Sequence, residues 1–537
     1  MSQYNEHPGD WLSFLKKDNN STLSILEAKS KYYKEQLLYE NFVSSIVQQQ
    51  EVLANQNQFA GGGICVENYA FDDKTELSAG IDLWINDKPT ALATYGEINC
   101  WDVSSITNMN SLFLGRATFN DDISNWDVSS VTTMNTLFFG CTAFNQPLNN
   151  WDVSSVTDMN FMFFNATSFN QPLGFWDVSG VTNTSAMFSS ATSFNQNIDS
   201  WDLSSNTTMQ AMFAGATNFN GYIGSWNVSN VTDFAQVFKG ATYFNQDISN
   251  WDLSSATTMI FMFEEAYTFN QPIVDWDLSS VIDIEGIFKF AYSFNQDISN
   301  WDVSIVTNFG SAFYSATIFD QPLDSWNVSS ATSMDSMFEQ ALIFNQDLSS
   351  WDLSSVTDTS LLFSQARLFN QSVNAWNVSS VTNMSGMFND AELYDQSMST
   401  WDVSSVTTME NMFKDTDSFN QDVSMWNVSA VTNMSSMFDR GLVFNNGGIA
   451  LDWAVGTGTS LVSDMSQMFL DAGLFNSNIS TWNTEAVINM EDMFLNAVIF
   501  NQDLSTWDVT LVTNCEDVAT GATAWVLDKP NFTSCTP

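Results

Sequence analysis

The residues best suited to chemistry in this sequence form a column of carboxylates. Fourteen tryptophans are spaced 25 residues apart, and the residue after each one is aspartate or asparagine. If successive copies stack in register, neighbouring carboxylates lie about 5 Å apart and repel by about 0.9 kcal/mol in water. Such a column is a candidate cation site. Its ten aspartates are Asp102, Asp127, Asp152, Asp177, Asp202, Asp252, Asp277, Asp302, Asp352 and Asp402.

Two interpretations of this aspartate column stay open. The first is a solvated acidic face, since serine recurs two positions after each aspartate. The second is weak binding of a divalent cation such as Ca²⁺. Carboxylates in a row lack the cage of roughly six to eight oxygens that a tight calcium site needs, so the affinity would be low. We expect no other cofactor and no catalytic residues. The single histidine, His7, and the lack of CxxC spacing argue against a zinc site.

The overall charge excludes two classes of partner. The chain of 537 residues has 61 acidic and 14 basic side chains, a formal charge of −47. Nucleic-acid binding needs clustered Lys and Arg, so we expect no nucleic-acid partner. Docking on anionic lipid also needs a basic patch, so the acidic composition argues against this kind of partner as well. No run of 18 apolar residues occurs, so we expect no direct membrane insertion.

The 25-residue period implies a tandem array. The regular tryptophans run from Trp101 to Trp426, and Trp453, Trp482 and Trp507 continue the array with looser spacing, which gives about 17 copies. A fixed period of this length is typical of a solenoid, in which each copy buries its apolar face against its neighbours.

Each copy is predicted to hold one short strand and one short helix. Trp126 alternates with Asp127 as in a strand that buries one face. Thr132 is then expected to cap a helix in which Met134 and Phe138 lie one turn apart. The prediction is therefore an α/β solenoid of about 17 strand-plus-short-helix repeats with a parallel sheet. The alternative is a right-handed parallel β-helix.

Several pieces of the repeat resemble a known family. The pattern IxxWxVxxV has the spacing of the leucine-rich repeat strand LxxLxLxxN. The pieces VTNMSSMF at 431–438 and FNDDISNWDVSSVT at 119–132 are similar to BspA-like leucine-rich repeat surface proteins, in particular to the repeat of roughly 25 residues in bacterial and mycoplasma-type surface lipoproteins. The resemblance covers about residues 98–513. It implies a leucine-rich-repeat-like, right-handed, curved array at a cell surface, with a role in adhesion and no enzyme activity.

The repeated apolar and amide positions have structural interpretations. We expect the tryptophans and the Met and Phe stripe to form the core rather than to stack on sugars. The asparagine of the recurring Phe-Asn-Gln pieces, such as Asn145 and Asn170, is expected to bond the turns of adjacent copies. Cys141 is interpreted as small core filler. Cys515 and Cys535 are interpreted either as one disulfide bridge or as free buried thiols.

The flanks differ from the array. We expect a flexible tail at 1–20, an amphipathic helix at 21–60, a linker with an N-terminal helical cap at 61–97, the solenoid at 98–513 and a C-terminal cap at 514–537. Within the cap we expect a helix at 75–87. Residues 21–56 are a candidate oligomerisation segment.

The leading functional hypothesis is a non-enzymatic, surface-displayed binding or adhesion protein that contacts a protein or glycan through the exposed face. The alternative is a structural spacer or cell-envelope scaffold with weak divalent-cation binding. A third hypothesis, an ice- or mineral-facing array, comes from the threonine that recurs six positions after tryptophan, as in Thr107, Thr132, Thr157 and Thr182. The resemblance suggests a cell-surface or secreted protein, but no signal peptide is visible, so a cytoplasmic location stays open.

Overall fold

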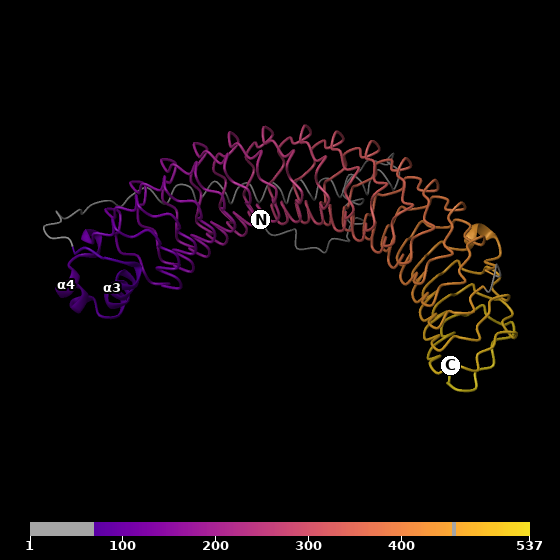
Figure 1. The fold of residues 1–537 in the computed structure, drawn as a ribbon. Coiled ribbons are helices and arrows are strands. Elements are labelled where there is room, and N and C mark those ends of the chain that lie inside the picture. Colours follow the sequence, from indigo (N-terminus) through magenta and orange to yellow (C-terminus); the bar gives the residue numbers. More distant parts are fainter. Residues whose placement is uncertain (1–68, 454–457) are drawn as a thin grey trace, which may run out of the picture. The chain divides into compact units, whose positions relative to one another are not determined.

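The computed structural model describes residues 69–453 and 458–537. These residues form two compact units, which we call the N-terminal unit (69–305) and the C-terminal unit (306–453 and 458–537). Each unit is a stack of coils, where one coil is one copy of the repeat counted from its tryptophan (Figure 1). The segments predicted at 1–20, 21–60 and 21–56 lie outside the described residues.

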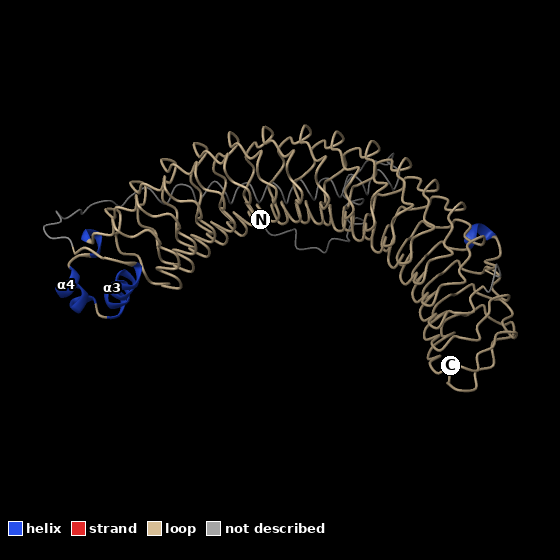
Figure 2. Cartoon of the chain, in the orientation of Figure 1, coloured by secondary structure: helices blue, strands red, loops and turns tan. Residues whose placement is uncertain are grey.

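Helices are confined to small parts of the described chain (Figure 2). The N-terminal unit begins with α3 (Lys74–Asn86) and α4 (Lys88–Tyr95), and a 3₁₀ turn η1 (Ile98–Cys100) leads into the first coil. A second 3₁₀ turn, η2 (Asn446–Gly448), lies in the C-terminal unit. Helix α3 lies one residue before the range expected for the capping helix, whereas α4 was not expected.

Helix α3 closes the first coil of the N-terminal unit. Its N-cap, Asp73, accepts a hydrogen bond from the Glu76 amide, which satisfies one of the free donors of the first turn. Its buried face includes Leu77, Ile81 and Trp84. The Trp84 ring meets the Trp101 ring edge-on, with centroids 5.8 Å apart. This apolar face covers the open end of the stack.

The predicted α/β solenoid with a parallel sheet is wrong. Among residues 69–453 and 458–537 no strand forms and no coil contains an α-helix. Neighbouring coils are joined instead by isolated parallel bridges, such as those of Thr133 with Asn108 and with Asp158. The alternative of a right-handed parallel β-helix is not supported either, because these coils lack its strands.

The helix is absent because the backbone reverses its handedness within the expected helical segment. Thr136 and Gly140 have φ values of 53° and 73°, which lie in the left-handed region. An α-helix needs each amide to bond the carbonyl four residues earlier. Here the Phe138 amide donates to Met162 O in the next coil at 2.8 Å. Bonds between coils therefore replace bonds along a helix, and Thr132 is not a helix N-cap.

The expected strand is replaced by turns, although its side-chain pattern is correct. Trp126 donates its amide to Ile123 O at 3.2 Å, and Val131 donates to Val128 O at 2.9 Å. Trp126 and Val128 are buried while Asp127 is exposed. The alternation thus predicts correctly which side chains are buried and which are exposed. The backbone, however, forms turns within the coil instead of a β-strand.

Continuous stacks of aromatic rings fill both units. Phe188 stacks on Phe213 with centroids 5.7 Å apart and an interplanar angle of 4°. Trp201 stacks on Trp226 at 6.3 Å and 7°, and its indole nitrogen donates to Leu173 O at 3.0 Å. The prediction that the tryptophans belong to the core is confirmed. A buried indole needs a partner for its N–H, and the preceding coils supply it.

A second ladder runs through the asparagines that follow the phenylalanines. Asn145 Oδ1 accepts the Asn170 amide at 2.9 Å, and Asn170 Oδ1 accepts the Asn195 amide at 2.9 Å. The same bond links Asn345 to Asn370 in the C-terminal unit at 2.9 Å. The predicted role of these side chains is confirmed, and the ladder fixes the register between adjacent coils.

Candidate binding surface

The aspartate column lies on the outside of both units. Nine of its ten members are exposed, and Asp102, which bridges Ala70, is half-buried. In all ten, Oδ1 accepts the backbone N–H of the serine two positions later at 2.9–3.1 Å. Each carboxylate therefore stabilises its own turn, a local bond that Asp and Asn make readily.

Bonds to serine lower the pKa of aspartates in this column. The hydroxyl and the amide of Ser154 lower the pKa of Asp152, and Ser179 does the same to Asp177. The charge of Asp177 works in the opposite direction on its neighbours Asp152 and Asp202, where it raises the pKa. The serine bonds dominate in Asp152 and Asp202, so the pKa of each is lowered.

Four members of the regular column are asparagines that make the same turn. Asn227 Oδ1 accepts the Ser229 amide at 3.2 Å and the Ser229 hydroxyl at 2.8 Å. Asn377 bonds Ser379 with the same two distances. The turn therefore depends on the side-chain oxygen and not on its charge.

The structure holds no cation cage that would use this column. Within the described ranges, no group of three or more His, Cys, Asp or Glu side chains is arranged to hold a metal ion. Weak cation binding therefore stays a prediction about single, exposed carboxylates.

A threonine six positions after the tryptophan forms another exposed column in thirteen of the fourteen regular copies, and Ile282 takes its place after Trp276. Thr157 donates its amide to Thr132 O at 2.9 Å and its hydroxyl to the same carbonyl at 3.3 Å. Thr382 and Thr407 repeat this arrangement in the C-terminal unit. These hydroxyls thus join neighbouring coils, which sequence reasoning missed because it assigned them to helix caps.

A comparison with known protein families identifies the family of the repeats. A model described as "Mycoplasma protein of unknown function, DUF285" matches five successive stretches, at residues 86–201, 185–300, 270–374, 360–457 and 454–534. The chain belongs to the DUF285 family. Among curated proteins, none matches this chain.

This DUF285 protein also contains disulfides. Cys515 and Cys535 are bonded, with Cα atoms 5.9 Å apart. Cys100 is disulfide-bonded too. Cys141 is a free, fully buried thiol whose pKa burial raises to about 12, which agrees with its interpretation as core filler. No helix in the part of the chain that the structure describes is long and apolar enough to cross a bilayer.

A partly buried ionic cluster in the C-terminal unit was not foreseen from the sequence. Lys414 Nζ lies 2.8 Å from Asp439, whose side chain is 1% exposed. Arg367 Nη2 lies 3.1 Å from Asp390, and Arg440 Nε lies 2.9 Å from Asp415 Oδ1. Desolvation raises the pKa of Asp390 to about 6, against the opposing effect of Arg367. The scattered charges gave no sequence signal, because only stacking brings them together.

Proposed function

We propose that this DUF285 protein is a non-enzymatic, surface-displayed binding protein that contacts a protein or glycan partner through its aspartate column. The observation that carries the proposal is the aspartate column, which presents a carboxylate in a fixed turn in ten of the fourteen regular coils. A series of identical weak contacts gives high avidity when a partner is itself repetitive.

The regularity of the coils supports binding over catalysis. Catalytic groups are usually recognised by pKa values shifted in a cleft. The serine two positions later lowers the pKa of Asp102, Asp152, Asp177, Asp202, Asp252, Asp302 and Asp402. Such a uniform series gives no single carboxylate a different task.

The disulfides support a location outside the cytoplasm. Disulfides such as Cys515–Cys535 persist in oxidising surroundings and are rare in reducing ones. The resemblance to BspA-like surface proteins points in the same direction. Labelling of intact cells with a membrane-impermeant reagent tests the location, and a protein protected until the cells are lysed would contradict it.

The binding experiment uses the full-length protein on glycan arrays and on intact cells. Changing Asp152, Asp177 and Asp202 to Asn removes three charges but keeps the turns, as the natural Asn227 shows. We expect at least about a tenfold loss of affinity for the partner, because the lost contacts multiply along the column.

A matched control makes this result specific. Asp247, Asp297 and Asp347 lie at another exposed position and also accept the amide of the serine two residues later. Changing these three to Asn gives the same charge change and is expected to leave binding intact. Equal losses in both variants would show a general charge effect, and the absence of any partner would favour the structural spacer.

A further inference from the structure

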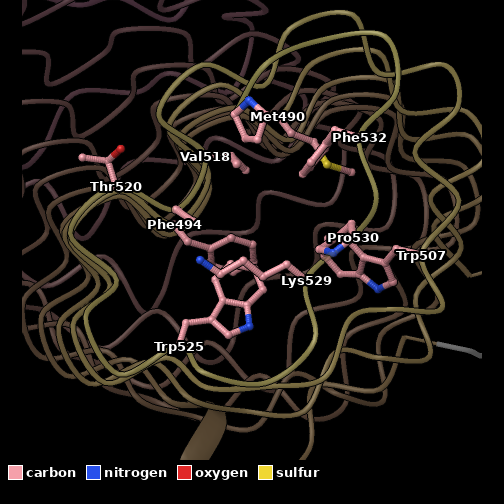
Figure 3. Close-up of a pocket in the computed structure, with 11 residues that line it drawn as sticks. Met490, Phe494, Trp507, Val518, Thr520, Trp525, Lys529, Pro530 and Phe532 are labelled. Atoms are coloured by element: carbon pink, nitrogen blue, oxygen red, sulfur yellow. The ribbon is translucent and has the colours of Figure 1, made fainter.

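A pocket opens in the last coil of the C-terminal unit. Its cavity volume is about 310 Å³. Most of its walls are apolar or aromatic, and Figure 3 shows Met490 and Phe532 on one side of the space and Phe494, Trp525 and Lys529 on the other. Phe494 and Trp507 are almost fully buried, with 1% and 5% of their surface exposed.

The pocket lies where the inner phenylalanine stack ends. A phenylalanine stands twelve positions after the tryptophan in fifteen of the first sixteen copies, the last being Phe494. In the copy of Trp453, which is longer, Phe469 takes this place sixteen positions after the tryptophan. The seventeenth copy has Ala519 at this position, and Ala519 lines the pocket. Phe469 stacks on Phe494 at 5.6 Å and 12°, but no ring of the last coil continues that stack. The missing ring leaves space at the end of an aromatic column.

Trp525 fills part of this space in a different orientation. It occupies the place of the outer phenylalanine, which stacks face to face in the preceding coils, as Phe475 does on Phe500 at 4°. Trp525 instead meets Phe494 at 72° and Phe500 at 86°. Its indole nitrogen is already bonded to Gln502 O at 2.9 Å. An edge-on ring covers less of a neighbouring face than a stacked ring does.

The lining selects the chemical class of an occupant. An apolar cavity of about 150 Å³ is large enough to hold benzene, so this pocket holds one ring or two fused rings. Aromatic rings gain from offset-stacked or edge-on contact with Phe and Trp side chains. Lys529 Nζ lies 5.1 Å from the centre of the Trp525 ring. The one cationic side chain of the lining therefore already contacts an aromatic ring.

From this geometry we propose that the pocket beside Ala519 is a binding site for a small, uncharged aromatic molecule of one or two rings. The bound ring takes the place of the absent phenylalanine, between Phe494, Trp507 and Trp525. The site is independent of the aspartate column and of its partner.

Isothermal titration of the full-length protein with indole tests the proposal. We expect one site with a dissociation constant on the order of 10⁻⁴ M. Phenol and cyclohexanol, which have the same size and hydroxyl group, separate aromatic from merely apolar binding. Phenol should bind at least about threefold more tightly, because ring stacking adds to the burial of area.

Ala519→Phe fills the cavity with the residue that the other copies have. It should weaken indole binding at least about tenfold and raise the melting temperature. Ala519→Val is a smaller change that fills part of the cavity, in case the larger variant does not fold. Thr523→Ala, at an exposed position of the same coil, is the control and should bind indole like the natural protein.

Three results would overturn the proposal. The first is no heat of binding with indole up to millimolar concentration. The second is equal affinity for phenol and cyclohexanol, which would leave a nonspecific apolar cavity. The third is undiminished indole binding by folded Ala519→Phe or Ala519→Val, which would place the indole elsewhere.

Discussion

The N-terminal and C-terminal units use the same coil but differ in how regularly they fill it. The N-terminal unit is closed by α3, whose Trp84 covers Trp101, and its inner phenylalanine stack runs unbroken from Phe113 to Phe288. The C-terminal unit has a tyrosine in its outer stack, Tyr394, and a charged cluster around Asp390. It ends in a pocket where Ala519 replaces a phenylalanine.

The stacks and ladders therefore tolerate an exceptional residue where the neighbouring coils keep the register. Tyr394 stacks on Phe369 at 5.9 Å and 3°, so the ring geometry is kept although its hydroxyl is buried without a hydrogen-bond partner. Each exception has an energetic cost that the regular coils avoid. We therefore expect the C-terminal unit to respond more to pH and to single substitutions that restore the pattern.

The largest effect is expected from truncating the regular stack. Phe213 packs between Phe188 and Phe238 at 5.7 and 5.9 Å. Phe213→Ala should lower the free energy of unfolding by about 3–5 kcal/mol, because a cavity opens in a tightly packed core. Denaturant unfolding measures the loss.

The control for this truncation is Tyr222→Ala in the same unit. Tyr222 is 63% exposed, so the change should cost no more than about 0.5 kcal/mol. Equal losses in the two variants would mean that the stacked ring does not stabilise the coil.

A smaller effect is expected from the ionic cluster. The pKa of Asp390 is raised from 3.8 to about 6, with desolvation as the main cause and Glu392 and Asp415 adding to it. The folded state then binds more protons than the unfolded state between these two values. The Asp390 contribution to stability is therefore present at about pH 4 and is lost as the pH rises through 6.

Asp390→Asn isolates this contribution. The difference in unfolding free energy between the natural protein and the variant should shift by up to about 3 kcal/mol against the natural protein between pH 4 and pH 7. Unfolding curves at several pH values measure the shift. Parallel pH profiles of the two proteins would contradict the raised pKa.

The smallest effect is expected at Tyr394. Its ring is fully buried, and desolvation raises the pKa of its hydroxyl well above the usual value. Tyr394→Phe removes an unsatisfied buried polar group and restores the residue of the other copies. We expect a gain of about 1 kcal/mol. Tyr243→Phe, a half-buried position in the N-terminal unit, is the comparison, and a larger gain there would be unexpected.

The burial pattern of the repeat and the asparagine bonds between copies could be predicted, because they depend on residue types whose burial or bonding is local. The alternation of Trp126 with Asp127 gives the correct inner and outer faces because only one of the two side chains gains from leaving water. The asparagine ladder could be predicted because a short amide side chain at a turn has few other partners. The DUF285 comparison agrees with the tandem repeats.

The local backbone conformation was predicted wrongly, because a helix was expected where the chain forms turns. Met134 and Phe138 have helical spacing, but this spacing also suits a chain of turns that brings the same residues inward. Gly115 and Gly140 offered a signal, since glycine adopts positive φ without steric cost. Phe161, with a φ of 54°, offered none. The bonds that hold it in this conformation come from the next coil, so they depend on tertiary structure.

The exposure of the aspartate column was predicted correctly, but the hydrogen bonds of its carboxylates were not predicted. Asp152 is exposed as expected, whereas its bonds to Ser154 were not expected. The charge cluster and the pocket beside Ala519 depend on which residues of distant copies meet, and one copy of the repeat does not contain this information.

The central claim is that consecutive coils lie side by side in register, and cysteine cross-linking tests it most directly. The Thr207 amide bonds Thr182 O at 2.9 Å, and adjacent parallel chains are about 4.8 Å apart, within disulfide reach. The pair Thr182→Cys and Thr207→Cys should cross-link under mild oxidation, and the pair Thr182→Cys and Thr232→Cys, two coils apart, should not. Efficient cross-linking of the second pair, or none of the first, would contradict the account.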